Sequence, residues 1–324
     1  MPLRAQQMLT GTIQSIVGRN ADATSRLAEK LGKKHESDWV SIYYKKNGDA
    51  VRSVLVPKSD RILEQVQTSS LSDGIYLVVQ EPVSWEDGEL ALLAEASGSN
   101  CQIVGPSSLA RYFGELNAAK TIAPDPMPMQ GPAIESGFTY VDRVFTVRGV
   151  GTVALGFSGE PLSVHDKLYA FPSGISVEVK SIQVLDEDQD SVGVGVRVGL
   201  ALKGAELTEL QDTYALSRDA AIFSQERRAA QVTKFKWVAG LPTKVHAFSY
   251  GVRSMATVDE RGSLTPDSPF PLRGRAILVD VNAKPRSPRV VGYATMDEKR
   301  RSHFLNNCPL FHYSLARADD PYVA

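Results

Sequence analysis

The sequence has 324 residues, of which 43% are hydrophobic and 23% are charged, and its formal net charge is −1. This length favours two or three domains, and the near-zero charge excludes a protein that binds nucleic acid or acidic membranes through its overall charge. Two distant cysteines, Cys101 and Cys308, support neither a disulfide framework nor a metal knuckle, so we expect no metal site.

The chain begins with MPLRAQQMLT, which lacks the apolar core of a signal peptide. No apolar run in the sequence approaches the roughly 20 residues that a membrane helix needs. We therefore expect a cytoplasmic protein whose partners include neither a membrane nor DNA.

The first third of the chain alternates between strand and helix patterns. The Asn47-Gly48-Asp49 turn between two β-rich runs predicts a hairpin. Apolar strands interleaved with helices are typical of a mainly parallel sheet covered on both faces, so we expect a small α/β domain over residues 1–120. Its predicted strands are 8–17, 40–44, 51–56, 75–79 and 102–104, and its predicted helices are 22–31, 60–67, 86–96 and 107–116.

Proline and glycine dominate the next segment. It contains Pro124, Pro126, Pro128, Gly131 and Pro132. This composition sustains neither a helix nor a central strand. We expect residues 121–136 to be an inter-domain linker.

The rest of the sequence consists of short β-rich runs separated by turns. Strands at this spacing predict two consecutive small β-barrels, the first over residues 137–217 and the second over 218–324 with a C-terminal tail. The acidic run 186–190 is expected to be an exposed loop. The apolar tail sequence FLNNCPLFHYSL suggests packing somewhere, but it indicates no function.

The most regular strand pattern covers residues 192–203. Valine or leucine occupies every second position from Val192 to Leu202, which predicts one continuous strand with a buried face. The opposite face carries glycine and alanine apart from Arg197 and Lys203. Such a face leaves room for a ligand or for a neighbouring backbone.

The start of the β-rich half resembles a known family. The run VDRVFTVRGVGTV at 141–153 is similar to the opening of domain II in translational GTPases of the elongation factor Tu type, above all in SelB, the selenocysteine-specific factor. GEPLSVHDKL at 159–168, VKSIQV at 179–184 and RVGLALKG at 197–204 continue the similarity in order, and residues 246–258 resemble part of domain III. The resemblance implies the layout of that family, an α/β G domain followed by two β-barrels.

The first domain departs from this family in its phosphate loop. The family motif G-x-x-x-x-G-K-[ST] wraps backbone N–H groups around the phosphates and supplies a lysine. Here the segment reads GRNADATS, in which Gly18 and Ser25 remain but Ala23 and Thr24 replace the second glycine and the lysine. A triphosphate would lose its main positive partner.

Two further nucleotide motifs are also missing. LVPKS at 55–59 stands where the family has D-x-P-G-H, and GPSS at 105–108 stands where it has the guanine-reading N-K-x-D. We therefore expect a degenerate GTPase domain that neither hydrolyses GTP nor requires GTP or Mg²⁺ as a cofactor. Two alternatives remain: a GTPase with non-standard motifs, and an unrelated α/β domain whose element order matches by chance.

The first barrel keeps residues that the resemblance connects with the aminoacyl end of tRNA. Asp142, Arg143 and Arg197 match the charged pocket that SelB is thought to use for an anionic aminoacyl group, and Gln183 stands near the position that contacts the terminal adenosine in elongation factor Tu. Two guanidinium groups beside one carboxylate favour a compact anion. The alternative is that Asp142 and Arg143 form a surface ion pair worth at most about 1 kcal/mol.

Other chemistry-bearing residues are weaker candidates. The five histidines are scattered, and the basic clusters Lys284–Arg289 and Lys299–Arg301 could meet phosphates or simply be solvated loops. We predict a non-catalytic elongation factor-like protein that binds tRNA, or a ribosomal or translation-factor partner, through domains II and III. A protein-interaction scaffold without any RNA role is the further alternative.

Overall fold

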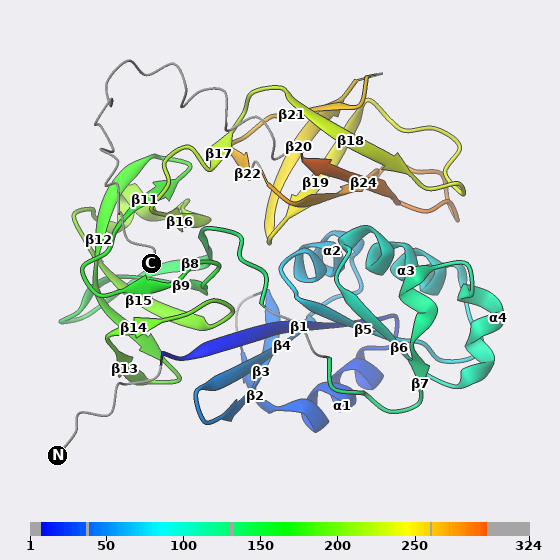
Figure 1. The fold of residues 1–324 in the computed structure, drawn as a ribbon, viewed down its shortest axis with the longest axis horizontal. Coiled ribbons are helices and arrows are strands. Elements are labelled where there is room, and N and C mark those ends of the chain that lie inside the picture. The colour runs from blue at the N-terminus through cyan, green and yellow to red at the C-terminus, as the bar shows by residue number, and fades with distance from the viewer. Residues whose placement is uncertain (1–7, 37–38, 130–132, 260, 272, 297–324) are drawn as a thin grey trace, which may run out of the picture.

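The computed structural model describes residues 8–36, 39–129, 133–259, 261–271 and 273–296, so the C-terminal tail with its basic cluster lies outside the described residues. The chain forms an α/β domain, a first β-barrel (domain II) and a second β-barrel (domain III), as Figure 1 shows. The predicted α/β domain followed by two β-barrels is thus confirmed. Among the described residues, no helix has the length and apolar character needed to cross a membrane.

A seven-stranded sheet with the order β2-β3-β4-β1-β5-β6-β7 forms the α/β domain. Its pairings from β4 to β7 are parallel, whereas β2 and β3 add an antiparallel edge. The short strand β7 pairs with β6 and lies inside the segment expected to be linker. The strands are β1 (Thr10–Gly18), β2 (Lys33–Glu36), β3 (Val40–Asn47), β4 (Ala50–Pro57), β5 (Gly74–Val78), β6 (Asn100–Val104) and β7 (Ile122–Ala123).

Helices cover both faces of this sheet. Helix α1 (Ala21–Leu31) packs on one face, whereas α2 (Ile62–Ser70) and α3 (Trp85–Ser97) lie between the other face and domain III (Figure 1). A capping box of Ser84 and Asp87 fixes the start of α3.

The helix expected at 107–116 is shorter than predicted. A 3-10 turn (Ser107–Leu109) leads into the single turn α4 (Ala110–Phe113), and a second 3-10 turn (Asn117–Lys120) follows. Gly114 ends α4, which agrees with the low helix propensity of glycine.

Domain II is a closed ring of strands in the order β11-β16-β8-β9-β15-β12, because β12 also pairs with β11. Strand β13 extends β12 as a hairpin, the short strands β10 and β14 pair with each other, and the one-turn helix α5 precedes β16. The elements are β8 (Thr139–Val147), β9 (Gly151–Phe157), β10 (Leu162–Ser163), β11 (Lys167–Phe171), β12 (Ile175–Val184), β13 (Glu187–Gln189), β14 (Ser191–Val192), β15 (Arg197–Lys203), α5 (Leu207–Leu210) and β16 (Ala215–Ser217).

Two strand predictions in domain II are wrong. The strand expected at 192–203 is interrupted between β14 and β15, because residues 193–195 turn to meet the α/β domain, although the alternating valines and leucines are buried as predicted. The loop expected at 186–190 contains β13, because Leu185 and Asp186 adopt positive φ angles of 50° and 64° and form a tight hairpin turn.

Domain III is a second closed barrel, with the strand order β18-β21-β20-β19-β23-β24. The short strands β17 and β22 pair beside it. The strands are β17 (Phe223–Ser224), β18 (Arg228–Lys234), β19 (Lys244–Ser249), β20 (Val252–Val258), β21 (Ser263–Pro266), β22 (Phe270–Pro271), β23 (Arg275–Val279) and β24 (Val290–Met296).

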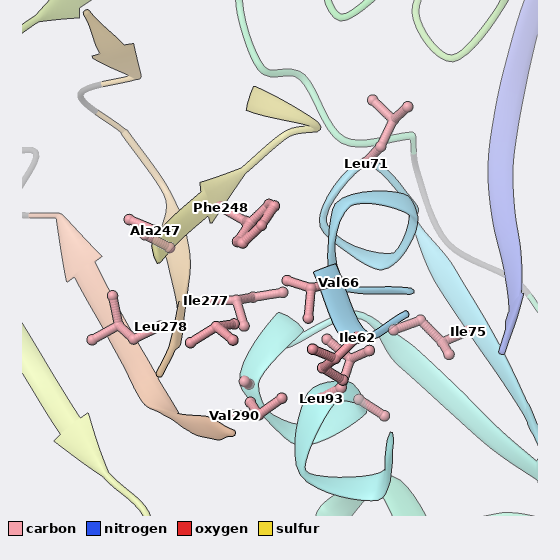
Figure 2. Close-up of a cluster of buried hydrophobic side chains, with 14 of the residues drawn as sticks. Ile62, Val66, Leu71, Ile75, Leu93, Ala247, Phe248, Ile277, Leu278 and Val290 are labelled. Carbon is pink, nitrogen blue, oxygen red and sulfur yellow. The ribbon is translucent and has the colours of Figure 1, made fainter. Parts of the chain in front are cut away.

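The α/β domain and domain III share one hydrophobic core. Figure 2 shows Val66 of α2 and Leu93 of α3 facing Phe248, Ile277 and Val290 of the barrel, and each of these side chains is at most 1% exposed. Burying a side chain of this size stabilises the fold by roughly 1.5–3 kcal/mol. The burial of apolar side chains from both domains therefore stabilises their association in the same way as a hydrophobic core stabilises a single domain.

A buried ion pair crosses the same interface. Glu89 on α3 is 2% exposed, and it accepts hydrogen bonds from the backbone N–H of Arg289 (2.6 Å) and from the Nε (3.1 Å) and Nη2 (2.6 Å) of that guanidinium. A bidentate contact of this kind fixes orientation as well as distance.

The α/β domain joins domain II through backbone hydrogen bonds. The N–H of Gly11 on β1 donates to the carbonyl of Val194 (2.8 Å), and the N–H of Gly193 donates to the carbonyl of Leu9 (2.7 Å). The chains approach so closely that a Cβ on Gly11 would lie 2.3 Å from the carbonyl oxygen of Gly195. Glycine is therefore required at this crossing, which extends β1 onto the barrel.

Candidate functional site

A cavity of about 650 Å³ lies between the α/β domain and domain II. Strands β2 and β3 of the α/β domain form one wall, and β8, β12 and β15 of the barrel form the other. The four residues that the sequence assigned to an aminoacyl pocket all line it: Asp142, Arg143, Gln183 and Arg197.

A β-bulge in β8 turns Asp142 into this cavity. The pairing with β9 jumps from Val141 opposite Gly156 to Arg143 opposite Leu155, so Asp142 is the extra residue. Neighbouring residues of a regular strand face opposite sides, but a bulge changes the direction of the side chains. Asp142 and Arg143 therefore both line the cavity despite being adjacent in sequence.

Asp142 and Arg197 form the buried pair at the base of the site. Their side chains are 1% and 11% exposed, and Nη1 of Arg197 lies 2.7 Å from Oδ2 of Asp142. The guanidinium also stacks over the ring of Phe157, 4.8 Å from its centroid. Asp142 thus pairs with a residue 55 positions away, and this burial distinguishes the pair from a surface ion pair.

Arg143 and Gln183 occupy the periphery. The Arg143 guanidinium lies 5.1 Å from the centroid of the Phe145 ring. The side-chain amide of Gln183 donates to Oδ1 of Asp188 (2.9 Å) across the β12–β13 hairpin. The structure therefore brings Asp142 and Arg197 into contact, while Gln183 makes its hydrogen bond to the hairpin.

Sequence reasoning missed two residues of the α/β domain that contact this pair. The indole N–H of Trp39 donates to Oδ2 of Asp142 (3.3 Å), and the side chain of Tyr44 lines the cavity beside Arg197. Burial raises the pKa of Tyr44 to about 12, so the phenol stays protonated at neutral pH. The aromatic residues at 39–44 were the available signal, but nothing in their spacing connects them with Asp142, which lies 103 positions after Trp39, or with the more distant Arg197.

The carboxylate of Asp142 has one oxygen left over. Oδ2 accepts from both Trp39 and Arg197, whereas Oδ1 is buried and has no hydrogen-bond partner among the described residues. A buried acceptor without a partner costs about 1–3 kcal/mol. Because this oxygen is closed off from solvent, the part of the pair that a ligand in the cavity can reach is the Arg197 side chain, which is 11% exposed.

The remainder of the α/β wall is basic. Lys33 and Lys34 of β2 are exposed and line the cavity together with Lys46, which pairs with Glu187 of the barrel (2.7 Å). The site therefore combines a buried carboxylate–guanidinium pair with lysines at its exposed side. Such an arrangement suits a ligand that carries phosphates next to a polar terminal group.

The degenerate phosphate loop lies elsewhere, at the carboxyl end of β1. Only Arg19 and Asn20 connect β1 to α1, and the Asn20 side chain caps the helix by accepting from the N–H of Ala23 (3.0 Å). Ala23 and Thr24 are buried in the first turn. A backbone donor that would be needed for phosphate is thus already used within the chain.

The charges around this connection also oppose a triphosphate. Arg19 is bound by the buried Asp87 (2.9 Å), and Asp22 and Glu81 line the same cavity of about 480 Å³. Three carboxylates and one paired arginine give this cavity an acidic lining, which repels the negative charge of a triphosphate.

The segments 55–59 and 105–108, which stand where the family has its other two nucleotide motifs, make hydrogen bonds within the α/β domain. The Ser59 hydroxyl donates to Glu64 (2.7 Å), and the Ser108 hydroxyl donates to Glu81 (3.2 Å). Neither segment places a carboxylate where the family motif has one. These positions serve local structure in this chain.

No protein-family model matches the sequence. An uncharacterized protein of Methanocaldococcus jannaschii is 29% identical over 215 residues, which cover 59% of this chain and 68% of that protein. The selenocysteine-specific elongation factor of the same organism is 34% identical over 96 residues, or 29% of this chain and 19% of the factor. The corresponding factor of Desulfomicrobium baculatum is 31% identical over 120 residues, or 37% and 18%. The chain thus spans less than a fifth of the length of these two factors.

Solved structures show the same relationship across the whole fold. A bacterial selenocysteine-specific elongation factor, EF-Sec, superimposes with a TM-score of 0.68 at 15% identity, covering 88% of this chain and 58% of that chain. SelB of Methanococcus maripaludis, in complex with the GTP analogue GPPNHP, gives a TM-score of 0.68 at 15% identity and covers 92% and 81%. The resemblance to SelB predicted from sequence is confirmed at the level of the fold, and the chain is SelB-like in its multidomain architecture.

Proposed function

We propose that this protein is a SelB-like translation factor that holds the acceptor end of a tRNA in the cavity between the α/β domain and domain II, without hydrolysing GTP. The observation that carries the proposal is the buried Asp142–Arg197 pair at the base of a cavity with lysines at its exposed side. The similarity to selenocysteine-specific elongation factors, among them the translation elongation factor SelB, supports it.

Each wall of the cavity has a distinct task in this proposal. Arg143 and Arg197 attract the polar end of the ligand, and Asp142 orients Arg197. Lys33 and Lys34 attract the phosphates that precede the terminal nucleotide, which makes binding weaker at high salt. Binding is then a property of geometry and charge, with no bond made or broken.

Loss of nucleotide hydrolysis is the second half of the proposal. The β1–α1 connection is short, its donor at Ala23 is capped by Asn20, and its arginine is bound to Asp87. The α/β domain then acts as a scaffold that supplies one wall of the cavity.

Gel-shift titration with aminoacylated and deacylated tRNA tests the binding site. We expect tighter binding of the aminoacylated form, and we expect Arg197→Ala to reduce binding at least tenfold. Arg218→Ala, which removes an arginine directly after β16 and outside the cavity lining, serves as the matched control and should bind as the wild type does. Equal weak binding of both tRNA forms by all variants would refute the pocket and favour a protein partner.

Isothermal titration with GTP and GDP in the presence of Mg²⁺ tests the second half. We expect no heat of binding at micromolar protein concentrations. Micromolar affinity for either nucleotide would show that a GTPase with non-standard motifs is the correct description.

A further inference from the structure

We propose that Trp39 and Tyr44 of the α/β domain are positioning residues that hold the Asp142–Arg197 pair in its binding geometry, so that the pocket is built jointly by two domains. This inference rests on the proposed function and deepens it. It assigns to the α/β domain a direct part in ligand recognition, although that domain lacks the nucleotide motifs.

Trp39 acts on the carboxylate. Its indole N–H donates to Oδ2 of Asp142 (3.3 Å), the same oxygen that Arg197 contacts at 2.7 Å. Its ring stands edge-on against Tyr140, with centroids 6.3 Å apart, which restricts its orientation. Two donors on one oxygen fix the rotation of the carboxylate and leave Oδ1 turned away from them, unpartnered among the described residues.

Tyr44 acts on the guanidinium. Its side chain lines the cavity beside Arg197, whose other contacts are Asp142 on one side and the face of Phe157 on another. A planar guanidinium that is held by a carboxylate and a ring face, with a phenol beside it, has a fixed plane. Its remaining N–H groups then have defined directions for a ligand.

The two residues come from a wall that is itself well anchored. Trp39 immediately precedes β3, and Tyr44 lies within it, paired with Ser53 of β4. The backbone crossing of Gly11 with Val194 fixes this sheet against the barrel. The two side chains are therefore held at a constant distance from the pair, which is the condition for positioning.

A double-mutant cycle on tRNA affinity tests the inference. Trp39→Phe keeps an aromatic ring but removes the N–H donor, and we expect it to weaken binding of aminoacylated tRNA about tenfold. Because Trp39 acts through Asp142, we expect the double variant with Asp142→Asn to bind no more weakly than Asp142→Asn alone. Fully additive losses would overturn the inference, because they would mean that the two residues act independently.

The matching cycle for the other side pairs Tyr44→Phe with Arg197→Lys. Trp85→Phe and Tyr169→Phe make the same chemical changes at exposed positions outside the cavity and should bind tRNA as the wild type does. Absence of tRNA binding by the wild type would overturn both the proposed function and this inference. Normal wild-type binding with additive losses would overturn the inference alone.

A spectroscopic readout reports on positioning in the free protein. With ¹⁵N-labelled tryptophan, Asp142→Asn should shift the indole N–H resonance of Trp39 and leave those of Trp85 and Trp237 unchanged. A Trp39 resonance that does not respond would overturn the hydrogen bond on which the inference is built.

Discussion

Asp73 provides a test of the packing between the α/β domain and the segment that leads into domain II. One carboxylate oxygen accepts from the N–H of Ile13 on β1 and the other from the N–H of Ile134, both at 2.6 Å. Burial nevertheless raises the pKa of Asp73 from 3.8 to about 6, because desolvation outweighs these two hydrogen bonds. The perturbation is Asp73→Asn, which removes the titration.

The pKa difference of Asp73 between the folded and unfolded states sets the sign and size of its contribution to stability at each pH. Between pH 3.8 and about 6 the folded state holds a proton on Asp73 that the unfolded chain has lost, so the stabilisation is complete at low pH and disappears as the pH rises through 6. A shift of about two units corresponds to roughly 3 kcal/mol over the whole range. Between pH 5 and pH 7 the loss is about 1.3 kcal/mol.

Urea unfolding followed by circular dichroism at pH 5, 6 and 7 measures how the unfolding free energy depends on the protonation of Asp73. Two other groups also have shifted pKa values: burial raises the pKa of Glu160, and burial with the charge of Arg253 lowers the pKa of His246. Both remain in the variant, so the difference between wild type and Asp73→Asn isolates Asp73. We expect the advantage of the wild type over the variant to shrink by about 1.3 kcal/mol from pH 5 to pH 7.

The matched control is Asp49→Asn, which removes the same charge from an exposed turn and should parallel the wild type at each pH. A wild-type advantage that stays constant or grows toward pH 7 would refute the reasoning. Carboxyl ¹³C chemical shifts of Asp73 across the same range give its midpoint directly.

Three further substitutions probe the interfaces and the cavity. Gly11→Ala places a Cβ 2.3 Å from the Gly195 carbonyl oxygen, so it should separate domain II from the α/β domain and speed limited proteolysis near that joint; unchanged digestion would contradict the close crossing. Glu89→Ala leaves the partly exposed Arg289 without its buried partner and should lower the unfolding free energy by about 2–3 kcal/mol in urea, whereas a neutral result would show that solvent replaces the pair. Gly199→Val lines the cavity with a larger side chain, its Cβ in ordinary contact with Leu155 at 3.4 Å, so it should weaken tRNA binding in a gel shift while the melting temperature stays within a few degrees; unaltered binding would place the ligand elsewhere.

The sequence predicted the architecture because its signals were local. Three patterns each indicate a local structure by themselves: the alternating valines and leucines, the hairpin turn at Gly48 and the apolar run at 75–79. The run at 141–153 then connected the chain with a family. The break between β14 and β15 could not be predicted, because it depends on residues 193–195 meeting β1 more than 180 positions earlier.

The candidate site was predicted only on the barrel side. Asp142, Arg143 and Arg197 were found through the resemblance, but the bulge that turns Asp142 into the cavity has no sequence signature. Trp39 and Tyr44 were missed because their contacts cross between domains, and a single sequence gives no sign of which distant strands meet.

Because Gly11 of the α/β domain packs directly against Gly195 of domain II, these domains are not independent units joined only by a linker. A gene fragment that encoded only the barrels would leave the backbone groups of Gly193 and Val194 without their partners in the α/β domain and would uncover the apolar face around Ile277 and Val290. We expect such a fragment to self-associate. The α/β domain therefore protects both barrels from association, because it covers these surfaces within the same chain.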